Sequence, residues 1–427
     1  MPGLYLTILP LLGAIAIGVV VWEFPEPALI ALYSTVPMGL ENILGRDPST
    51  IVSLQKTCMI GVCAILIVKR GFSGQFNGPA LAITVAAFFS GMFGSVHGKI
   101  DLSSMMRALL GSIAPFVVIW IRPRQTTRNH LILAVALGPL LSVAFGIALN
   151  IFGIHALFGV DQYGIPRLQG TTIPAFMAFL AVAAVMASFT EYALSGEARW
   201  LLLTIAAALC VLASGTRIPI VCVVLFCLIV LLFGRGPRFG VRRRGRLWLM
   251  ALAGATLAAL ALGPALFART FGRTGANAGL NTSGRDVLWP IYANAISRYP
   301  LFGQGIGTYR VLVDPEDVKY QGTLAAHNEY LRIGADLGFV GLTLIIVGHV
   351  IWFHTQWRFL NKIERVVVVA FGISFACYSL TDNTMIAPIT PNIYLWLAML
   401  MDRARARAEE QGRATRRGSP LSRGAVR

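Results

Sequence analysis

The chain has 427 residues, of which 56% are hydrophobic and only 13% are charged. Soluble domains carry about 25% charged residues, so this composition excludes a soluble surface around a core. The formal net charge of +17 would suit a nucleic-acid binder, but the arginines cluster beside apolar runs, as in the cytoplasmic segments of membrane proteins. We therefore predict one all-α integral membrane protein.

Long apolar runs recur along the chain, and roughly 20 such residues cross a bilayer as a helix. They predict about twelve spans, at 4–22, 51–68, 79–96, 103–121, 130–153, 171–190, 199–214, 218–234, 247–268, 337–356, 365–381 and 385–401. The first run lacks a basic segment before it, so we expect a retained span and not a removed signal peptide. The apolar segment 26–42 contains Pro37 and Glu41, which favours a short re-entrant or interfacial piece. Whether it spans the membrane stays open.

Basic residues fix the expected orientation. With the N-terminus inside, the cytoplasmic segments become 69–78, 122–129, 191–198, 235–246, 357–364 and the tail, and they receive every basic cluster. The predicted organisation is a membrane domain of nine spans at 1–268, a large periplasmic loop at 269–336, three further spans at 337–401 and a disordered basic tail at 402–427. Both termini are then cytoplasmic.

Topology does not explain arginines on the outer side, and three of them are candidate binding residues. Arg217 lies in the turn SGTRIP at 214–219, Arg285 lies in the first half of the large loop, and Arg167 precedes a span. Guanidinium groups hold phosphate oxygens through forked donors and keep their charge. The arginines therefore suggest a clamp for a lipid diphosphate, with Arg167 as a supporting residue. The alternative is an arginine that snorkels or bonds a loop carbonyl.

His327, near the end of the large loop, is the candidate base. An imidazole can take a proton from a sugar hydroxyl near neutral pH. A histidine that caps a helix or bonds a lipid headgroup is the alternative. Asp382, at the outer end of the eleventh predicted span, is a further polar contact, or else it bonds neighbouring loop amides.

Four sequence elements around these residues resemble the O-antigen ligase and O-antigen polymerase superfamily. They are SGTR at 214–217, SGRDVLW at 283–289, PLFGQGIG at 300–307, and HNEYL at 327–331 followed by DLGFVG at 336–341. The detailed resemblance covers roughly residues 205–345. Asp336 stands where the family frequently has glutamate, so its role stays open, like that of Asn328 beside the histidine.

The resemblance implies a metal-independent membrane glycosyltransferase without a cofactor. Its partners would be a glycan donor on undecaprenyl diphosphate and a lipid-linked sugar acceptor, either a lipid A core or a second carrier-linked glycan. His327 would activate the acceptor hydroxyl, while Arg217 and Arg285 would hold the diphosphate. The acidic turn at 314–317 could bind a hard cation, but a solvated turn is the favoured interpretation.

Three functions remain in competition. A ligase reaction in cell-surface polysaccharide assembly is favoured slightly over an O-antigen or exopolysaccharide repeat-unit polymerase, and the motifs do not separate the two. A polysaccharide transporter or flippase is less favoured, because transporters place ionisable groups within their spans. Here Lys56 and Arg107 are the clearest charged residues inside predicted spans. The sugar composition, the linkage, the acceptor and the oligomeric state are not encoded in any motif.

Overall fold

The computed structural model describes residues 17–43, 48–93, 102–161, 164–271, 285–313 and 325–417. Of these residues 79% are helical, in agreement with the predicted fold class, and two short antiparallel strands, β1 (Phe158–Val160) and β2 (Pro166–Leu168), form a hairpin. The helices are α2 (Pro25–Thr35), η1 (Val36–Met38), α3 (Leu40–Ile43), α4 (Pro48–Arg70), α5 (Gly78–Phe93), α6 (Leu102–Val117), η2 (Val118–Trp120), α7 (Gln125–Ile151), α8 (Pro174–Ser195), α9 (Ala198–Ala213), α10 (Arg217–Phe233), α11 (Val241–Phe271), α12 (Arg285–Arg298), η3 (Thr308–Arg310), α14 (Glu329–Trp357), α15 (Lys362–Ser379) and α16 (Thr390–Arg417).

Five helices of the described residues are long and apolar enough to cross a membrane: α4, α6 continued by η2, α7, α8 and α14. A sixth span results if Ile17–Glu23 and Pro25–Met38 are counted as one bent span. Helices α5, α9 and α10 are apolar but shorter. Every predicted span from 51–68 onward overlaps a helix, whereas most of 4–22 lies outside the described residues. The number twelve therefore remains a prediction.

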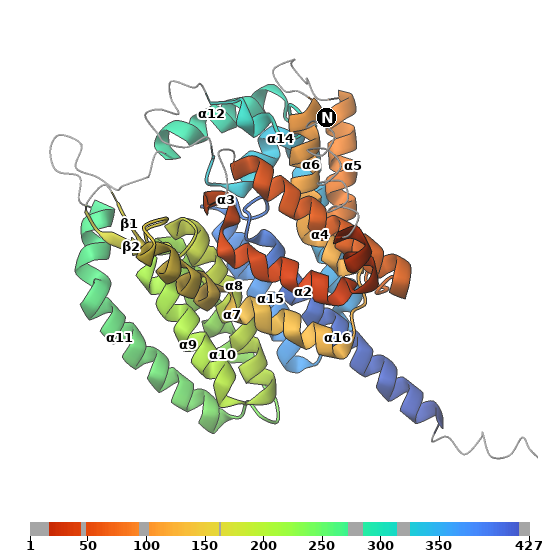
Figure 1. Cartoon of the computed structure of the whole chain (residues 1–427), viewed down its shortest axis with the longest axis vertical. Helices are drawn as coiled ribbons and strands as arrows, with labels where there is room; N and C mark the ends of the chain where they lie inside the picture. Colours follow the sequence, from red (N-terminus) through yellow and green to blue (C-terminus); the bar gives the residue numbers. More distant parts are fainter. Residues whose placement is uncertain are drawn as a thin grey trace, which may run out of the picture.

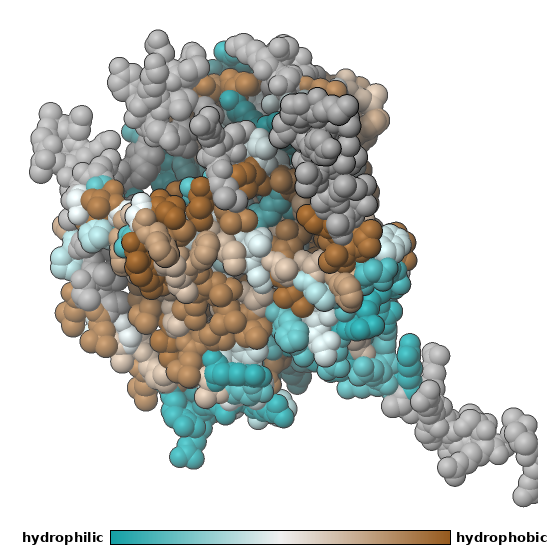
Figure 2. Space-filling model, viewed as in Figure 1, coloured by the Kyte–Doolittle hydropathy of each residue, from teal (hydrophilic) through white to brown (hydrophobic). Residues whose placement is uncertain are grey.

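Helix α8 lies at the centre of the helix bundle, and 94% of its apolar stretch is buried. It is rich in alanine and packs against α7, α9 and α10, as small residues allow in membrane helices. Figure 1 shows these helices side by side, with α11 along their outer edge. In Figure 2, hydrophobic side chains cover much of the middle of the visible face, and hydrophilic ones gather toward its lower end. This distribution suits a lipid-facing band.

The segment 26–42, which the sequence left open, runs alongside α4. Glu26 pairs with Arg70 at the end of α4, and Gln55 near its start donates to Thr35. The segment therefore follows most of α4 instead of turning back. A break at Phe24 bends it by 114° from Ile17–Glu23, a geometry that a broken span and a re-entrant loop share.

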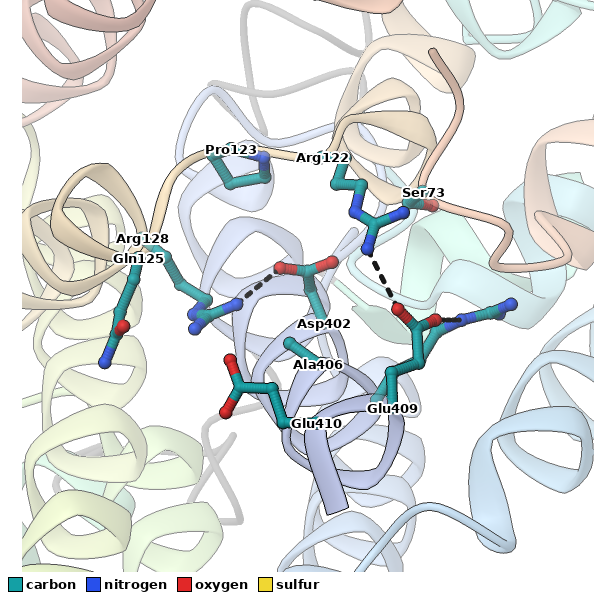
Figure 3. A pocket seen from close by; sticks show the side chains of 10 residues that line it. Ser73, Arg122, Pro123, Gln125, Arg128, Asp402, Ala406, Glu409 and Glu410 are labelled. Carbon is teal, nitrogen blue, oxygen red and sulfur yellow. Dashed lines mark hydrogen bonds and ion pairs between the residues drawn. The ribbon is translucent and has the colours of Figure 1, made fainter. Parts of the chain in front are cut away.

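Two ends of the bundle are distinguished from here on. The α12 end carries α12 and the start of α14, and lies at the top of Figure 1. The tail end is the opposite one, where the basic half of α16 meets the predicted cytoplasmic loops. Figure 3 shows a pocket there, in which Arg128 pairs with Asp402 at 2.8 Å and Arg122 with Glu409 at 2.9 Å.

The tail differs from the expected disordered segment, because α16 continues as a helix to Arg417. The Arg403 guanidinium makes two hydrogen bonds with the Glu191 carboxylate of α8, at 2.7 and 2.8 Å. Arg407 makes two with Glu364 of α15, at 2.7 and 3.1 Å. These tertiary ion pairs order a segment whose composition alone suggested disorder. The rest of the tail lies outside the described residues.

Candidate active site at the α12 end

His327 lies two residues before the start of α14, in a backbone conformation that residues other than glycine rarely adopt. Its φ is +47°, the only positive φ of a non-glycine residue among those the structure describes. Left-handed backbone costs about 1–2 kcal/mol and persists where the surroundings enforce it, often at functional sites. The imidazole Nδ1 lies 3.3 Å from Asp382 Oδ1, with the two side chains 32% and 28% exposed. Two predicted site residues are thus brought together from distant parts of the chain.

The loop between α15 and α16 holds the Asp382 carboxylate. The N–H of Asn383 donates to Asp382 Oδ1 at 2.8 Å, and Asn383 Oδ1 accepts from the N–H of Asn328 at 3.3 Å. The Asn328 side chain accepts from the N–H of Leu331 at 3.1 Å, so this residue is the N-cap of α14. His327 thus faces the Asp382 carboxylate, while its neighbour Asn328 caps α14 and bonds the loop between α15 and α16.

Arg285 is the first residue of α12, and its Nη2 donates to the carbonyl oxygen of Thr381 at 2.8 Å. Burial lowers the pKa of Arg285, the Asp382 carboxylate raises it, and the nearby charge of Arg217 lowers it again. Arginine nevertheless stays protonated at every working pH. The two guanidinium groups and the carboxylate are therefore near enough to interact, and a bound anion would relieve the repulsion between the two cations.

Arg217 is the first residue of α10, and another arginine fixes the turn before it. Arg167, on β2, donates from Nε to the carbonyl oxygen of Ser214 and from Nη2 to Thr216 Oγ1, both at 2.8 Å. Arg167 therefore bonds a loop carbonyl, which is the alternative that the sequence left open for an outer arginine. These contacts make Arg167 a positioning residue for the turn that carries Arg217.

Asp336 lies apart from the histidine, fully buried in α14. Its Oδ2 is 3.1 Å from Arg332 Nη1, and its Oδ1 accepts from the N–H of Tyr309 at 3.0 Å. Its backbone oxygen accepts from Ser90 Oγ at 2.8 Å. Asp336 therefore joins α14 to η3 and α5 and has a positioning role.

A buried ion pair in the first turns of α14 was not predicted from the sequence. Arg332 Nη2 is 2.5 Å from Glu329 Oε1, and the two side chains are 4% and 2% exposed. Glu329, Arg332 and Asp336 are spaced three and four residues apart, which places acid, base and acid on one helix face. This spacing is visible in the sequence. It could be recognised only by assuming one continuous helix across residue 336, where the predicted outer loop ends.

Gly338 explains why two of the sequence motifs occur together. It breaks the helical backbone of α14 with a φ of +68°, and a Cβ atom there would lie 2.3 Å from the carbonyl oxygen of Leu301. At this kink the N–H groups of Phe339 and Val340 donate to the carbonyls of Pro300 and Leu301, at 2.8 and 3.1 Å. The glycine therefore lets the 300–307 motif dock directly on α14.

A metal site does not emerge from the part of the chain that the structure describes: no three His, Cys, Asp or Glu side chains there could hold an ion. The acidic turn at 314–317 lies outside the described residues.

An all-α bundle with apolar crossing helices, and a polar cluster at one end of it, defines the class as an integral membrane protein with a site at one membrane face. Residues 202–346 match the family model of O-antigen ligase, which confirms the resemblance predicted from the motifs. Arg217, Arg285 and His327 lie within the matched region, whereas Arg167 and Asp382 lie outside it. A comparison with curated proteins finds no match. The family indicates an O-antigen ligase-type function on lipid-linked glycans in a bacterial membrane.

Proposed function

We propose that the chain is a glycosyltransferase that moves a glycan from undecaprenyl diphosphate to an acceptor hydroxyl at the periplasmic face, in an O-antigen ligase-type reaction. The observation that carries this proposal is the His327–Asp382 pair beside Arg285, which is itself near Arg217. A base is needed to activate a hydroxyl, and fixed cations are needed where charge develops on a leaving diphosphate. The cluster supplies both.

In the proposed reaction the acceptor O–H bond breaks and its proton goes to His327 Nε2, because Nδ1 faces Asp382. The hydroxyl oxygen forms a bond to the anomeric carbon of the donor sugar. The bond from that carbon to the diphosphate oxygen breaks, and the diphosphate leaves with the electron pair. Arg217 and Arg285 stabilise the added charge. Direct displacement inverts the configuration at the anomeric carbon, and no metal or cofactor enters the proposal.

The proposed location is the bacterial inner membrane, with both termini in the cytoplasm. In support, residues from the predicted cytoplasmic segments meet at the tail end, where Arg128 pairs with Asp402 and Arg403 with Glu191. The candidate site lies at the α12 end, which would then face the periplasm. Cysteine labelling of a variant with a single cysteine in the 286–298 segment tests this: labelling from the cytoplasmic side alone would contradict the orientation.

A repeat-unit polymerase uses the same chemistry with a second carrier-linked glycan as acceptor. Lipid-linked glycans isolated from a deletion strain distinguish the two reactions. Full-length polymer stranded on the carrier lipid identifies a ligase, and single repeat units stranded there identify a polymerase. An unchanged lipid-linked pool contradicts both.

Transfer by the purified protein in detergent separates both reactions from transport. A transferase joins donor and acceptor without a membrane or a gradient, whereas a transporter or flippase produces no new glycosidic bond. Absence of product with every donor and acceptor pair that restores the deletion strain would overturn the proposed function.

A further inference from the structure

A cationic cavity lies at the α12 end, and neither Arg217 nor Arg285 lines it. It has a volume of about 300 Å³ and is lined by residues of α3, α4, α6, η3, the start of α8 and the loop before α16. Three basic side chains reach it, Lys56, Arg107 and Arg310, against one carboxylate, Glu41. The two charged residues that stood out within the predicted spans, Lys56 and Arg107, thus meet at one place.

Lys56 is only 4% exposed, although it lies in a membrane-length helix. Its Nζ donates to the carbonyl oxygens of Gly111 and Ile386, at 3.2 and 3.0 Å, and it forms no ion pair among the described residues. An ammonium group has three donors, and carbonyls do not neutralise its charge. Charged residues inside membrane segments are costly and mark substrate or ion sites. The position therefore suits an anion in the cavity.

The two arginines of the cavity are also without carboxylate partners in the part of the chain described here. Arg107 is exposed on α6 and has no hydrogen bond or ion pair there. Arg310 donates from Nε to the Tyr309 hydroxyl at 3.2 Å, and its guanidinium lies 5.7 Å from the centre of that ring. Planar guanidinium groups bind phosphate through paired donors, so the cavity combines two such groups with a buried ammonium.

The cavity shares structural elements with the candidate active site. The loop between α15 and α16 contributes Asp382 to the His327 pair, and four residues later Ile386 accepts the Lys56 hydrogen bond. On the other side, Tyr309 lines the cavity and donates its N–H to Asp336. A ligand in the cavity would thus lie next to the site but on different cations from those assigned to the donor diphosphate.

We propose that this cavity binds a phosphate group of the lipid-linked acceptor. The proposal rests on the proposed function, because a transferase must hold two lipid-linked substrates at once. Arg217 and Arg285 take the donor, and Lys56, Arg107 and Arg310 take the acceptor. Phosphate is common to both acceptor classes: a second undecaprenyl diphosphate glycan carries a diphosphate, and a core glycolipid carries phosphates on its sugars.

Binding measured by native mass spectrometry on the full chain in detergent tests the proposal without requiring transfer. The probes are undecaprenyl diphosphate, a phosphorylated core glycolipid, the same glycolipid after phosphatase treatment, and phosphatidylglycerol. The variants are Arg107→Gln and Arg310→Gln, with Arg217→Gln for the donor site. Arg298→Gln, an exposed position at the other end of α12, is the matched control. Size-exclusion profiles establish that each variant is folded, and exposed Arg107 tolerates substitution best.

We expect Arg107→Gln and Arg310→Gln to weaken one phosphorylated probe about tenfold, as loss of a charged hydrogen bond does. Arg298→Gln should leave it unchanged, and the dephosphorylated glycolipid should bind all variants equally. If the acceptor is carrier-linked, the parent protein binds two equivalents of undecaprenyl diphosphate. Arg107→Gln then loses one of them and Arg217→Gln loses the other. Weakening confined to the core glycolipid identifies a phosphorylated core.

Two results would overturn the cavity as an acceptor site. One is unchanged affinity of Arg107→Gln and Arg310→Gln for both phosphorylated probes. The other is equal weakening for phosphatidylglycerol, which would identify bulk anionic lipid as the ligand. The binding assay does not measure transfer, so the two proposals can fail separately. If the protein shows the expected binding pattern but never transfers glycan, only the proposed function is contradicted.

Discussion

Both ends of the helix bundle are rich in arginine, but the arginines have different partners. At the tail end, Arg403 and Arg407 each make two hydrogen bonds with a carboxylate, Glu191 and Glu364 respectively. At the α12 end, Arg285 bonds the carbonyl oxygen of Thr381 and lies near both the Asp382 carboxylate and a second cation, Arg217. A guanidinium satisfied by a carboxylate holds helices together, whereas cations gathered near one another favour an incoming anion. We therefore assign Arg403 and Arg407 a structural role, and Arg285 a binding role beside Arg217.

Replacing His327 with alanine should have the largest effect on transfer. A general base contributes about 10²–10⁴-fold to rate, so transfer should fall by at least about a hundredfold. Helix content and elution volume should not change, because the side chain is partly exposed. The rate of product formation in detergent measures the effect. His130→Ala, an exposed histidine at the tail end, is the control, and equal rates for the two variants would remove His327 from the mechanism.

Arg285→Lys tests whether the α12 end needs a fork or only a positive charge. Lysine keeps the charge but loses the paired donors. We expect transfer to fall by about 10²-fold, the loss seen when one donor to a developing anion is removed. Arg298→Lys on the same helix should retain full transfer. Full activity of Arg285→Lys would mean that simple charge attraction suffices.

Asp382→Asn should have a smaller effect, because it acts through the histidine. Partners that orient metal-bound histidines contribute about 10–100-fold, and here the long 3.3 Å contact favours the lower end of that range. We therefore expect about a tenfold fall in kcat with an unchanged KM for the donor. A raised donor KM with unchanged kcat would instead assign Asp382 to binding. Asn383→Ala measures how much the loop contributes without touching the carboxylate.

The sequence predicted the all-α class, the positions of most helices, and the residues that the structure gathers at the α12 end. Local patterns carry that information: apolar length gives helices, and basic residues give sidedness. Arg285 and His327 could be selected because no topological reason exists for them.

Features that depend on long-range packing could not be predicted in this way. The pairing of His327 with Asp382 joins residues in two different loops, and no periodicity encodes it. The same holds for the cavity that unites Lys56 with Arg310. The prediction of a disordered tail was wrong because the sequence gives no sign that Arg403 has a partner. In the fold, Arg403 forms an ion pair with Glu191 of α8. Patterns within one helix are visible in a sequence, whereas contacts between helices require the fold.

Arg403→Gln tests the other half of the comparison and should have the smallest effect on transfer. The ion pair with Glu191 ties α16 to α8, and breaking hydrogen bonds to a charged group costs about 1.5–3 kcal/mol. Thermal unfolding in detergent should therefore occur at a lower temperature, while transfer at 25 °C stays within about twofold of the parent.

Glu191→Gln should destabilise the protein to a similar extent, and the double variant should lose less than the sum of the two, because the pair is broken once. Additive losses would mean that the two side chains act independently. A large loss of transfer in folded Arg403→Gln would be more serious, because a carboxylate-paired arginine far from His327 would then contribute to the reaction. In that case the partner of an arginine would no longer separate structural positions from binding positions in this bundle.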